Sequence, residues 1–138
     1  AAKQEMERLS SFFDGKSFKR KVPSEYLYIF HAIERSQYDG IIAAVVPEGI
    51  LSSAGHSPFR NWLLKNVQIL GVLSLPSGYC FEGTAIRCSI LFLKKNADIP
   101  GDYTISMFEL RPEDMVQGKA VEETAEAIRQ MLTLEDRL

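Results

Sequence analysis

Cysteine and histidine are scarce in this sequence of 138 residues, which contains only two of each. Cys80 and Cys88 do not form a Cys-x-x-Cys pair, and too few histidines accompany them to complete a zinc site, so we expect no metal centre. Long apolar runs are missing too. No stretch reaches the roughly 18 residues that a membrane-spanning helix needs, and no charged-then-apolar leader is visible. We expect a soluble, cytoplasmic protein with reduced thiols and no membrane contact.

A strong net charge is also absent, because the formal charge is -2 at pH 7. This balance excludes a strongly basic nucleic-acid binder, although a local basic patch could still contact phosphate. Residues 1–21 are rich in lysine and arginine, whereas acids outnumber bases in residues 101–138. With 46% hydrophobic residues, the chain can form one core and is too short for two ordinary domains. It opens without Met, so we expect an excised piece or a processed product.

Three segments have the apolar spacing of helices. Ser24 is expected to cap a helix that ends near Gln37, and Ser57, followed by proline, to cap one that ends near Asn66. Residues 119–132 should form a final helix with acids on its outer side. A short helix and a loop are expected before residue 24. Helices that alternate with apolar runs indicate an α/β fold.

The apolar runs between these helices predict the strands. Residues 41–46 have the pattern of a strand buried on both faces, as in a parallel sheet covered by helices. The runs 67–75 and 85–93 are joined by a loop that is too short for a crossover helix, so these strands should be antiparallel. Residues 103–110 alternate enough to form a peripheral fourth strand. The predicted architecture is an α/β sheet with an antiparallel β-hairpin and a C-terminal helix.

Five short motifs follow one another between residues 22 and 96. They are Ser-Glu-Tyr-Leu at 24–27, Val-Val-Pro-Glu-Gly-Ile-Leu at 45–51, Phe-Arg-Asn-Trp-Leu-Leu at 59–64, Leu-Ser-Leu-Pro-Ser-Gly at 73–78 and Phe-Glu-Gly-Thr-Ala-Ile at 81–86. Their order and spacing resemble those of the modification (M) subunits of type I restriction-modification systems, which are adenine-N6 DNA methyltransferases. Ala85 departs from the glycine that relatives usually have there, which suggests a slightly altered loop.

The resemblance implies a partial doubly wound, Rossmann-like methyltransferase sheet. In the family, a glycine-rich cofactor loop and an Asn-Pro-Pro-Phe/Tyr motif lie in the first half of the catalytic domain, and neither occurs in this sequence. The chain therefore resembles only the carboxyl-terminal half. This implies S-adenosylmethionine as cofactor of the full parent, with no cofactor-binding, catalytic or metal-ligating residue in this chain. Alone, the chain is expected to be inactive.

The resemblance points to Phe81 as the residue that stacks on a flipped-out target adenine, since adenine chemistry requires the base to leave the duplex. Tyr79 is the alternative platform, because the alignment could slip by two residues. Phe81 could instead plug the end of the hairpin. Glu48 follows the first strand at the same edge of the sheet and could line the target pocket, or it could simply belong to a turn.

Further residues are candidates for DNA contact. Thr84 and Arg87 lie on the same hairpin and could bind phosphate or hold the loop. Lys19, Arg20 and Lys21 form a basic stretch that could contact phosphate, or a solvated loop. His31 and His56 have no partner at metal or triad spacing and are expected to be structural.

Residues 1–23 thus form a basic leading segment, 24–96 the methyltransferase half-domain, and 97–138 a peripheral strand and acidic helix. The expected partners are DNA, specificity and restriction subunits, and the missing N-terminal half, whose absence should make the fragment self-associate. An alternative is a stand-alone, degenerate methyltransferase-like module that binds DNA or subunits without catalysis.

Overall fold

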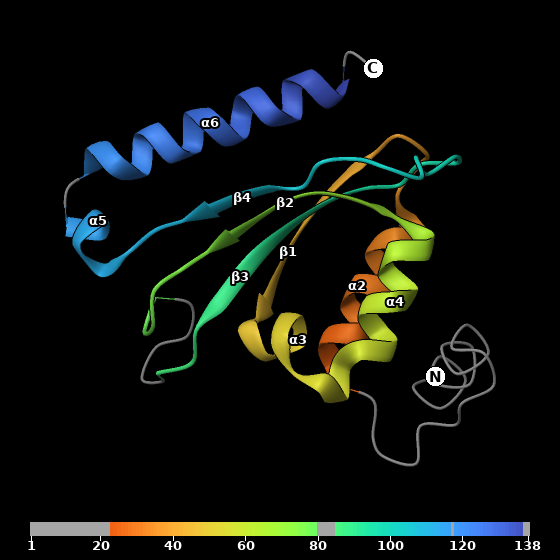
Figure 1. The fold of residues 1–138 in the computed structure, drawn as a ribbon, viewed down its shortest axis with the longest axis horizontal. Coiled ribbons are helices and arrows are strands. Elements are labelled where there is room, and N and C mark those ends of the chain that lie inside the picture. The colour runs from red at the N-terminus through yellow and green to blue at the C-terminus, as the bar shows by residue number, and fades with distance from the viewer. Residues whose placement is uncertain (1–22, 80–84, 117, 137–138) are drawn as a thin grey trace.

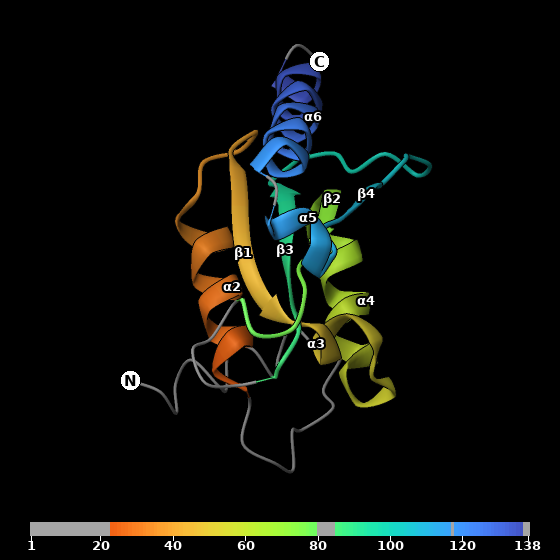
Figure 2. The ribbon, with the colours of Figure 1, turned by 90° about the vertical axis from the view of Figure 1, so that its left-hand side faces the viewer.

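The computed structural model describes residues 23–79, 85–116 and 118–136. They form a four-stranded sheet with helices on both faces (Figure 1). Helices α2 (Ser24–Arg35) and α4 (Ser57–Asn66) lie on one face, and the long α6 (Gly118–Asp136) crosses the other (Figure 2). The predicted α/β class is therefore confirmed. Within the described ranges, none of the helices is long and apolar enough to cross a membrane.

The two predicted helices of the first face are present, but their caps differ from the prediction. Pro23 and His56 occupy the N-cap positions, while Ser24 and Ser57 are already helical, and neither cap has a side-chain hydrogen bond. The Pro23 carbonyl accepts a bond from Tyr26 N at 3.1 Å, so the backbone itself starts the first helix. Serine favours the N-cap statistically, and the structure places both serines one residue further in.

The strands form a sheet in the order β1-β3-β2-β4. As predicted, β2 (Gln68–Ser74) and β3 (Cys88–Lys94) are antiparallel. Strand β3 also pairs antiparallel with β1 (Ile41–Pro47) and so separates β1 from β2. The short β4 (Ser106–Glu109) lies parallel to β2 at the other edge. The peripheral fourth strand is thus confirmed, over fewer residues.

Strand β1 corrects one prediction. We expected it to be buried on both faces, yet Ala43 and Val45 are exposed, with Val45 at 56% relative exposure. Ile42 and Val46 on the opposite face are buried under α2 and α4. The apolar run therefore faces a core along one side, while on the other side Ile41 packs against the second core and Ala43 and Val45 are exposed. Among the described residues, β1 pairs with no strand other than β3.

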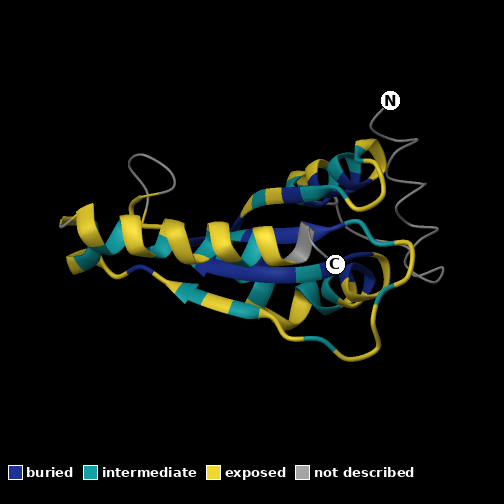
Figure 3. Cartoon of the chain, turned by 90° about the horizontal axis from the view of Figure 1, so that it is seen from above, coloured by how far each residue is buried: buried dark blue, intermediate teal, exposed yellow. Residues whose placement is uncertain are grey.

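Each face of the sheet has its own core. On the first face, the side chains of α2 and α4 pack on β1–β3, and Phe59 and Phe30 are among the largest fully buried residues. On the second face, α6 packs over β2 and β3 through residues such as Ile128 and Met131. Gly71 permits this contact, because a Cβ there would lie 2.8 Å from Met131 Sδ. Figure 3 shows buried strand segments beneath α6, whose outer side is exposed.

Several short elements were not predicted. These are α3 (Glu48–Ser52), the 3₁₀ helix η1 (Ala54–His56) and α5 (Pro112–Val116). The expectation of reduced thiols is wrong for Cys88, which is disulfide-bonded and almost fully buried at the start of β3. That expectation came from the presumed compartment, which carries no information about the local geometry of one residue. The helix expected before residue 24 lies outside the described residues.

Candidate functional site

The carboxyl ends of β1 and β2 lie at one edge of the sheet. Because β3 is antiparallel to both, its first residues lie at this edge too, with Cys88 opposite Pro47 and Ser89 opposite Ser74. Open α/β sheets bind their ligands at this end of their strands. We call it the carboxyl edge, in contrast to the lateral edges of the sheet, which β1 and β4 form.

Two of the predicted site residues, Glu48 and Arg87, meet at the carboxyl edge. Glu48 N donates to Arg87 O at 3.0 Å, and Glu48 Oε2 lies 3.6 Å from Arg87 Nε. The two side chains are 44% and 45% exposed, respectively, so water screens the ion pair and it adds little stability. The backbone hydrogen bond holds the main chain of Glu48 next to Arg87, while both charged side chains stay accessible to a ligand.

Tyr79 extends from the turn that follows β2. Gly78 precedes it with φ 87°, a left-handed conformation that favours glycine. Leu75 N donates to Cys88 O at 3.0 Å and closes the base of this loop. Tyr79 is 53% exposed, so within the described residues its ring is not used as a core residue. Its proposed stacking role stays a prediction.

The remaining predicted site residues lie outside the described residues. These are Phe81, Thr84, Lys19, Arg20 and Lys21. Their expected roles in base stacking and phosphate contact therefore remain predictions from the sequence.

A polar and aromatic cluster lies beneath the carboxyl edge, where α2 and α4 begin. Tyr26 stacks on Phe59 with ring centroids 3.9 Å apart, and its hydroxyl hydrogen-bonds His56 Nδ1. Burial raises the pKa of the Tyr26 hydroxyl, and the nearby Arg60 charge partly opposes this shift. Sequence reasoning found His56 to be structural but missed its partner, because the two residues are 30 positions apart.

Arg60 was also missed as a contributor to this edge. Its Nη1 donates to Ile50 O at 2.8 Å and to Ser53 O at 2.7 Å, so one nitrogen holds two carbonyls of the segment after β1. The Phe-Arg-Asn-Trp motif contains this residue, but helical spacing alone could not show which segment it contacts.

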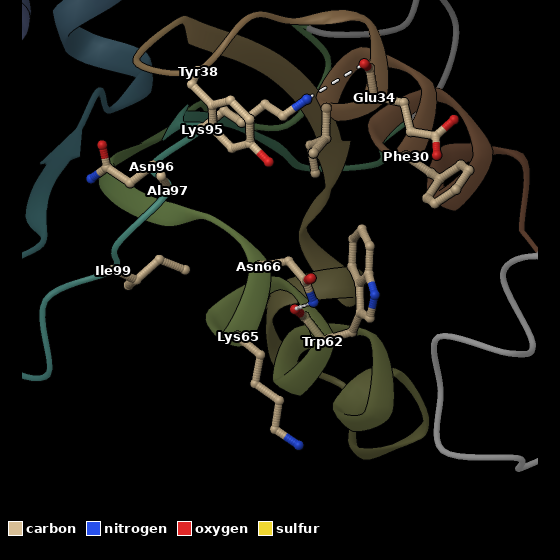
Figure 4. A pocket seen from close by; sticks show the side chains of 11 residues that line it. Phe30, Glu34, Tyr38, Trp62, Lys65, Asn66, Lys95, Asn96, Ala97 and Ile99 are labelled. Atoms are coloured by element: carbon tan, nitrogen blue, oxygen red, sulfur yellow. Dashed lines mark hydrogen bonds between the residues drawn. The ribbon is translucent and has the colours of Figure 1, made fainter.

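A cavity of about 380 Å³ lies at the end of the strands opposite the carboxyl edge. It lies between the carboxyl ends of α2 and α4 (Figure 4). Lys95 Nζ donates to Ser36 O at 2.8 Å there and lies 5.1 Å from the centre of the Tyr38 ring. None of the predicted site residues lines it. The lining residues are Phe30, Ile33, Glu34, Tyr38, Trp62, Lys65, Asn66, Lys95, Asn96, Ala97 and Ile99.

Two of the described glycines are closely packed: a Cβ would lie 2.8 Å from Gln37 O at Gly40 and 2.8 Å from Met131 Sδ at Gly71. Gly55, Gly101 and Gly118 have open space beside them. No described group of three or more His, Cys, Asp or Glu side chains could hold a metal ion.

Several solved structures share this fold, and three of them illustrate the match. A protein from Listeria monocytogenes assigned to the class I S-adenosylmethionine-dependent methyltransferases matches at 21% identity and a TM-score of 0.60, over 85% of this chain and 37% of its own. The type I restriction-modification methyltransferase subunit from Streptococcus thermophilus matches at 21% identity and 0.62, over 88% and 28%. A structure from a study of complex assembly in the type I restriction-modification system matches at 23% and 0.57, over 83% and 26%.

The fold is therefore that of part of a class I S-adenosylmethionine-dependent methyltransferase. The chain belongs to the N-6 DNA Methylase family, whose sequence model matches residues 2–134. This confirms the family predicted from the motifs. No curated protein matches the chain. The chain spans about a quarter to somewhat over a third of the three solved chains, from 26% to 37%.

Proposed function

We propose that this chain forms the target-base side of the adenine-N6 methylating site in a longer DNA methyltransferase of a restriction-modification system. The observation that carries the proposal is the convergence of Glu48, Tyr79 and Arg87 at the carboxyl edge. The sequence singled out these three residues in or beside separate motifs, and β3 brings them to one end of the sheet. The family match supports the same reaction class.

The proposed chemistry is capture of an extruded adenine. An enzyme that methylates the amino group of adenine must take the base out of the duplex and hold it against an aromatic or apolar face. Phe81 is the proposed platform, with the exposed Tyr79 ring as the alternative. Glu48 lines the pocket at the end of β1. Arg87 keeps an accessible guanidinium for phosphate, and the other proposed phosphate contacts are Thr84, Lys19, Arg20 and Lys21.

The methyl donor, S-adenosylmethionine, is bound elsewhere in the proposed parent. It supplies the methyl group, and residues of this chain hold the base that receives it. We therefore expect no detectable binding when the isolated chain is titrated with S-adenosylmethionine in a calorimeter. A low-micromolar affinity for S-adenosylmethionine would contradict the proposal that the other half of the catalytic domain binds the cofactor.

The proposed parent acts in the cytoplasm, and its partners are DNA, the specificity and restriction subunits, and the half-domain that holds the cofactor. A solved neighbour from a study of type I complex assembly supports this choice of partners. We also propose that the isolated chain self-associates as a symmetric dimer through the outer edge of β1. The exposed Ala43 and Val45 lie on this strand, and no charged residue or bulge interrupts it before Pro47.

The alternative is a symmetric dimer in which α2 packs against its copy. Glu25, Tyr28 and Arg35 lie on one side of this helix, and Tyr28 is 74% exposed. When the helix packs antiparallel on its copy, Glu25 meets the second copy's Arg35. The same patch thus complements itself, as a twofold interface requires.

Aromatic substitutions in the full parent test the target-base role. Phe81→Ala should lower adenine methylation about 5- to 150-fold with S-adenosylmethionine affinity retained, because stacking contributes about 1–3 kcal/mol per base. Tyr38→Ala is the matched control, since Tyr38 is an exposed tyrosine at the opposite edge. Loss of activity in Tyr79→Ala but not Phe81→Ala would move the platform by two residues. Normal activity in both variants would exclude the hairpin as the base-holding element.

A further inference from the structure

We infer that Arg60 is a positioning residue that holds the segment carrying Glu48 in place at the carboxyl edge. The inference rests on the proposed target-base function for its catalytic consequence, but the structural step can be tested alone. Nothing in the motif pattern assigns this role to Arg60.

The first observation is the double contact of the guanidinium. Arg60 Nη1 donates to Ile50 O and Ser53 O, at 2.8 and 2.7 Å. Both carbonyls belong to the end of α3, where backbone oxygens lack partners within the helix. A positive charge at the carboxyl end of a helix also interacts favourably with its dipole. Arg60 therefore acts as a side-chain cap supplied from a different helix.

The second observation concerns the support of these two hydrogen bonds, which we call the Arg60 clamp: Arg60 belongs to a helix that is fixed in the core. Arg60 lies between Phe59, which is fully buried, and the Trp62–Leu63 pair in the same core. Ile50, one of the clamped residues, is also buried in that core. The guanidinium thus ties the turn after β1 to a helix that cannot move without disturbing the main core.

The third observation is that Glu48 is held from two sides. At its own position, Glu48 N is bonded to Arg87 O at 3.0 Å. Further along, Ser53 N donates to Gly49 O at 2.8 Å, while Ser53 O accepts from both Arg60 and His56 N. With only five residues, α3 has too few internal bonds to stay formed alone. Without Arg60, the segment keeps its backbone bond to Arg87 and the packing of Ile50, and loses the side-chain hydrogen bonds from α4.

Amide hydrogen exchange on this chain tests the clamp. In Arg60→Ala, the Ser53 and His56 amides should exchange about 10-fold faster or more, because bonds to a charged donor are among the stronger ones. The Val67 amide, bonded to Leu63 O at the far end of α4, should be unchanged. Arg60→Lys should restore part of the protection. Arg111→Ala removes an equal charge from an exposed position and serves as the control.

The parent enzyme tests the consequence. Arg60→Ala should raise the KM for DNA several-fold with the KM for S-adenosylmethionine unchanged, and Arg60→Lys should lie between it and the wild type. Unchanged Ser53 exchange overturns the clamp, and faster exchange with an unchanged KM for DNA overturns the positioning role. A parent that is insensitive to Phe81 and Tyr79 substitution refutes the target-base proposal instead, while the exchange result still decides the clamp. If Arg60→Ala does not fold, Arg60→Lys is measured in both assays.

Discussion

The two faces of the sheet differ in how completely they are covered. On the first, α2 and α4 bury alternate residues of β1, β3 and β2, with stacked aromatic rings between the helices. On the second, α6 covers β2 and β3, while Ala43 and Val45 of β1 remain exposed. An exposed valine on an edge strand is a feature that soluble proteins normally cover. Among the described residues, the first face is therefore closely covered, whereas part of β1 stays uncovered on the second.

The largest expected effect is on the closely covered first face. Phe59→Ala should lower the free energy of unfolding by about 3–5 kcal/mol, because it leaves a cavity among fully buried rings. Val45→Ala, on the exposed side of β1, should change the free energy of unfolding by no more than about 0.5 kcal/mol. Urea unfolding followed by circular dichroism, at a concentration where the chain is monomeric, measures both. Equal losses in the two variants would mean that the faces do not differ.

A smaller effect is expected where α6 meets the sheet. The Cβ of Gly71→Ala would lie 2.8 Å from Met131 Sδ and 3.0 Å from Ser106 O, so the Met131 side chain must move and the β4 backbone must give way slightly. We expect a loss of about 1–3 kcal/mol, as for other overpacked sites. Thermal unfolding checks this, with Gly101→Ala as the control because nothing lies within 4 Å of a Cβ there. An unchanged midpoint in Gly71→Ala would show that α6 is packed loosely.

The smallest effect on stability is expected at the exposed residues of β1, Ala43 and Val45. The effect on assembly should be clear there. Wild-type chain should gain apparent mass with concentration in light scattering, and Val45→Lys should abolish the gain, since edge lysines discourage strand pairing. Met107→Lys is the matched control, because Met107 is 69% exposed on β4 at the other edge. A wild type that stays monomeric at high concentration, or equal effects of both variants, would rule out β1 as the interface.

Much of the fold could be predicted from the sequence because the elements are locally encoded. Helical spacing indicated α2 and α4 within about two residues, and the short loop after β2 predicted the antiparallel pairing with β3. The exposure of Val45 could not be predicted in this way. A continuous apolar run predicts a strand that is buried on both faces. The pattern does not show whether this chain has a helix that covers the second face.

The candidate site was only partly predictable, for a related reason. Glu48 belongs to a recognisable motif and Arg87 directly follows one, but their contact depends on β3 lying next to β1. The bonds of Arg60 to Ile50 and Ser53 depend on how a helix packs against a preceding turn. Such tertiary contacts leave no periodic pattern in the sequence.

The position of β3 between β1 and β2 also governs the order in which the sheet can be assembled. Strand β1 precedes its described strand partner by the whole of α3, α4 and β2, so a long loop must close before its backbone bonds form. The β2–β3 pair closes a much shorter loop. On a ribosome, β1 would leave the exit tunnel before residues 88–94 do, because residues 48–87 lie between them. Its backbone donors and apolar side chains therefore wait unpaired during synthesis, when chaperones or premature association can reach them.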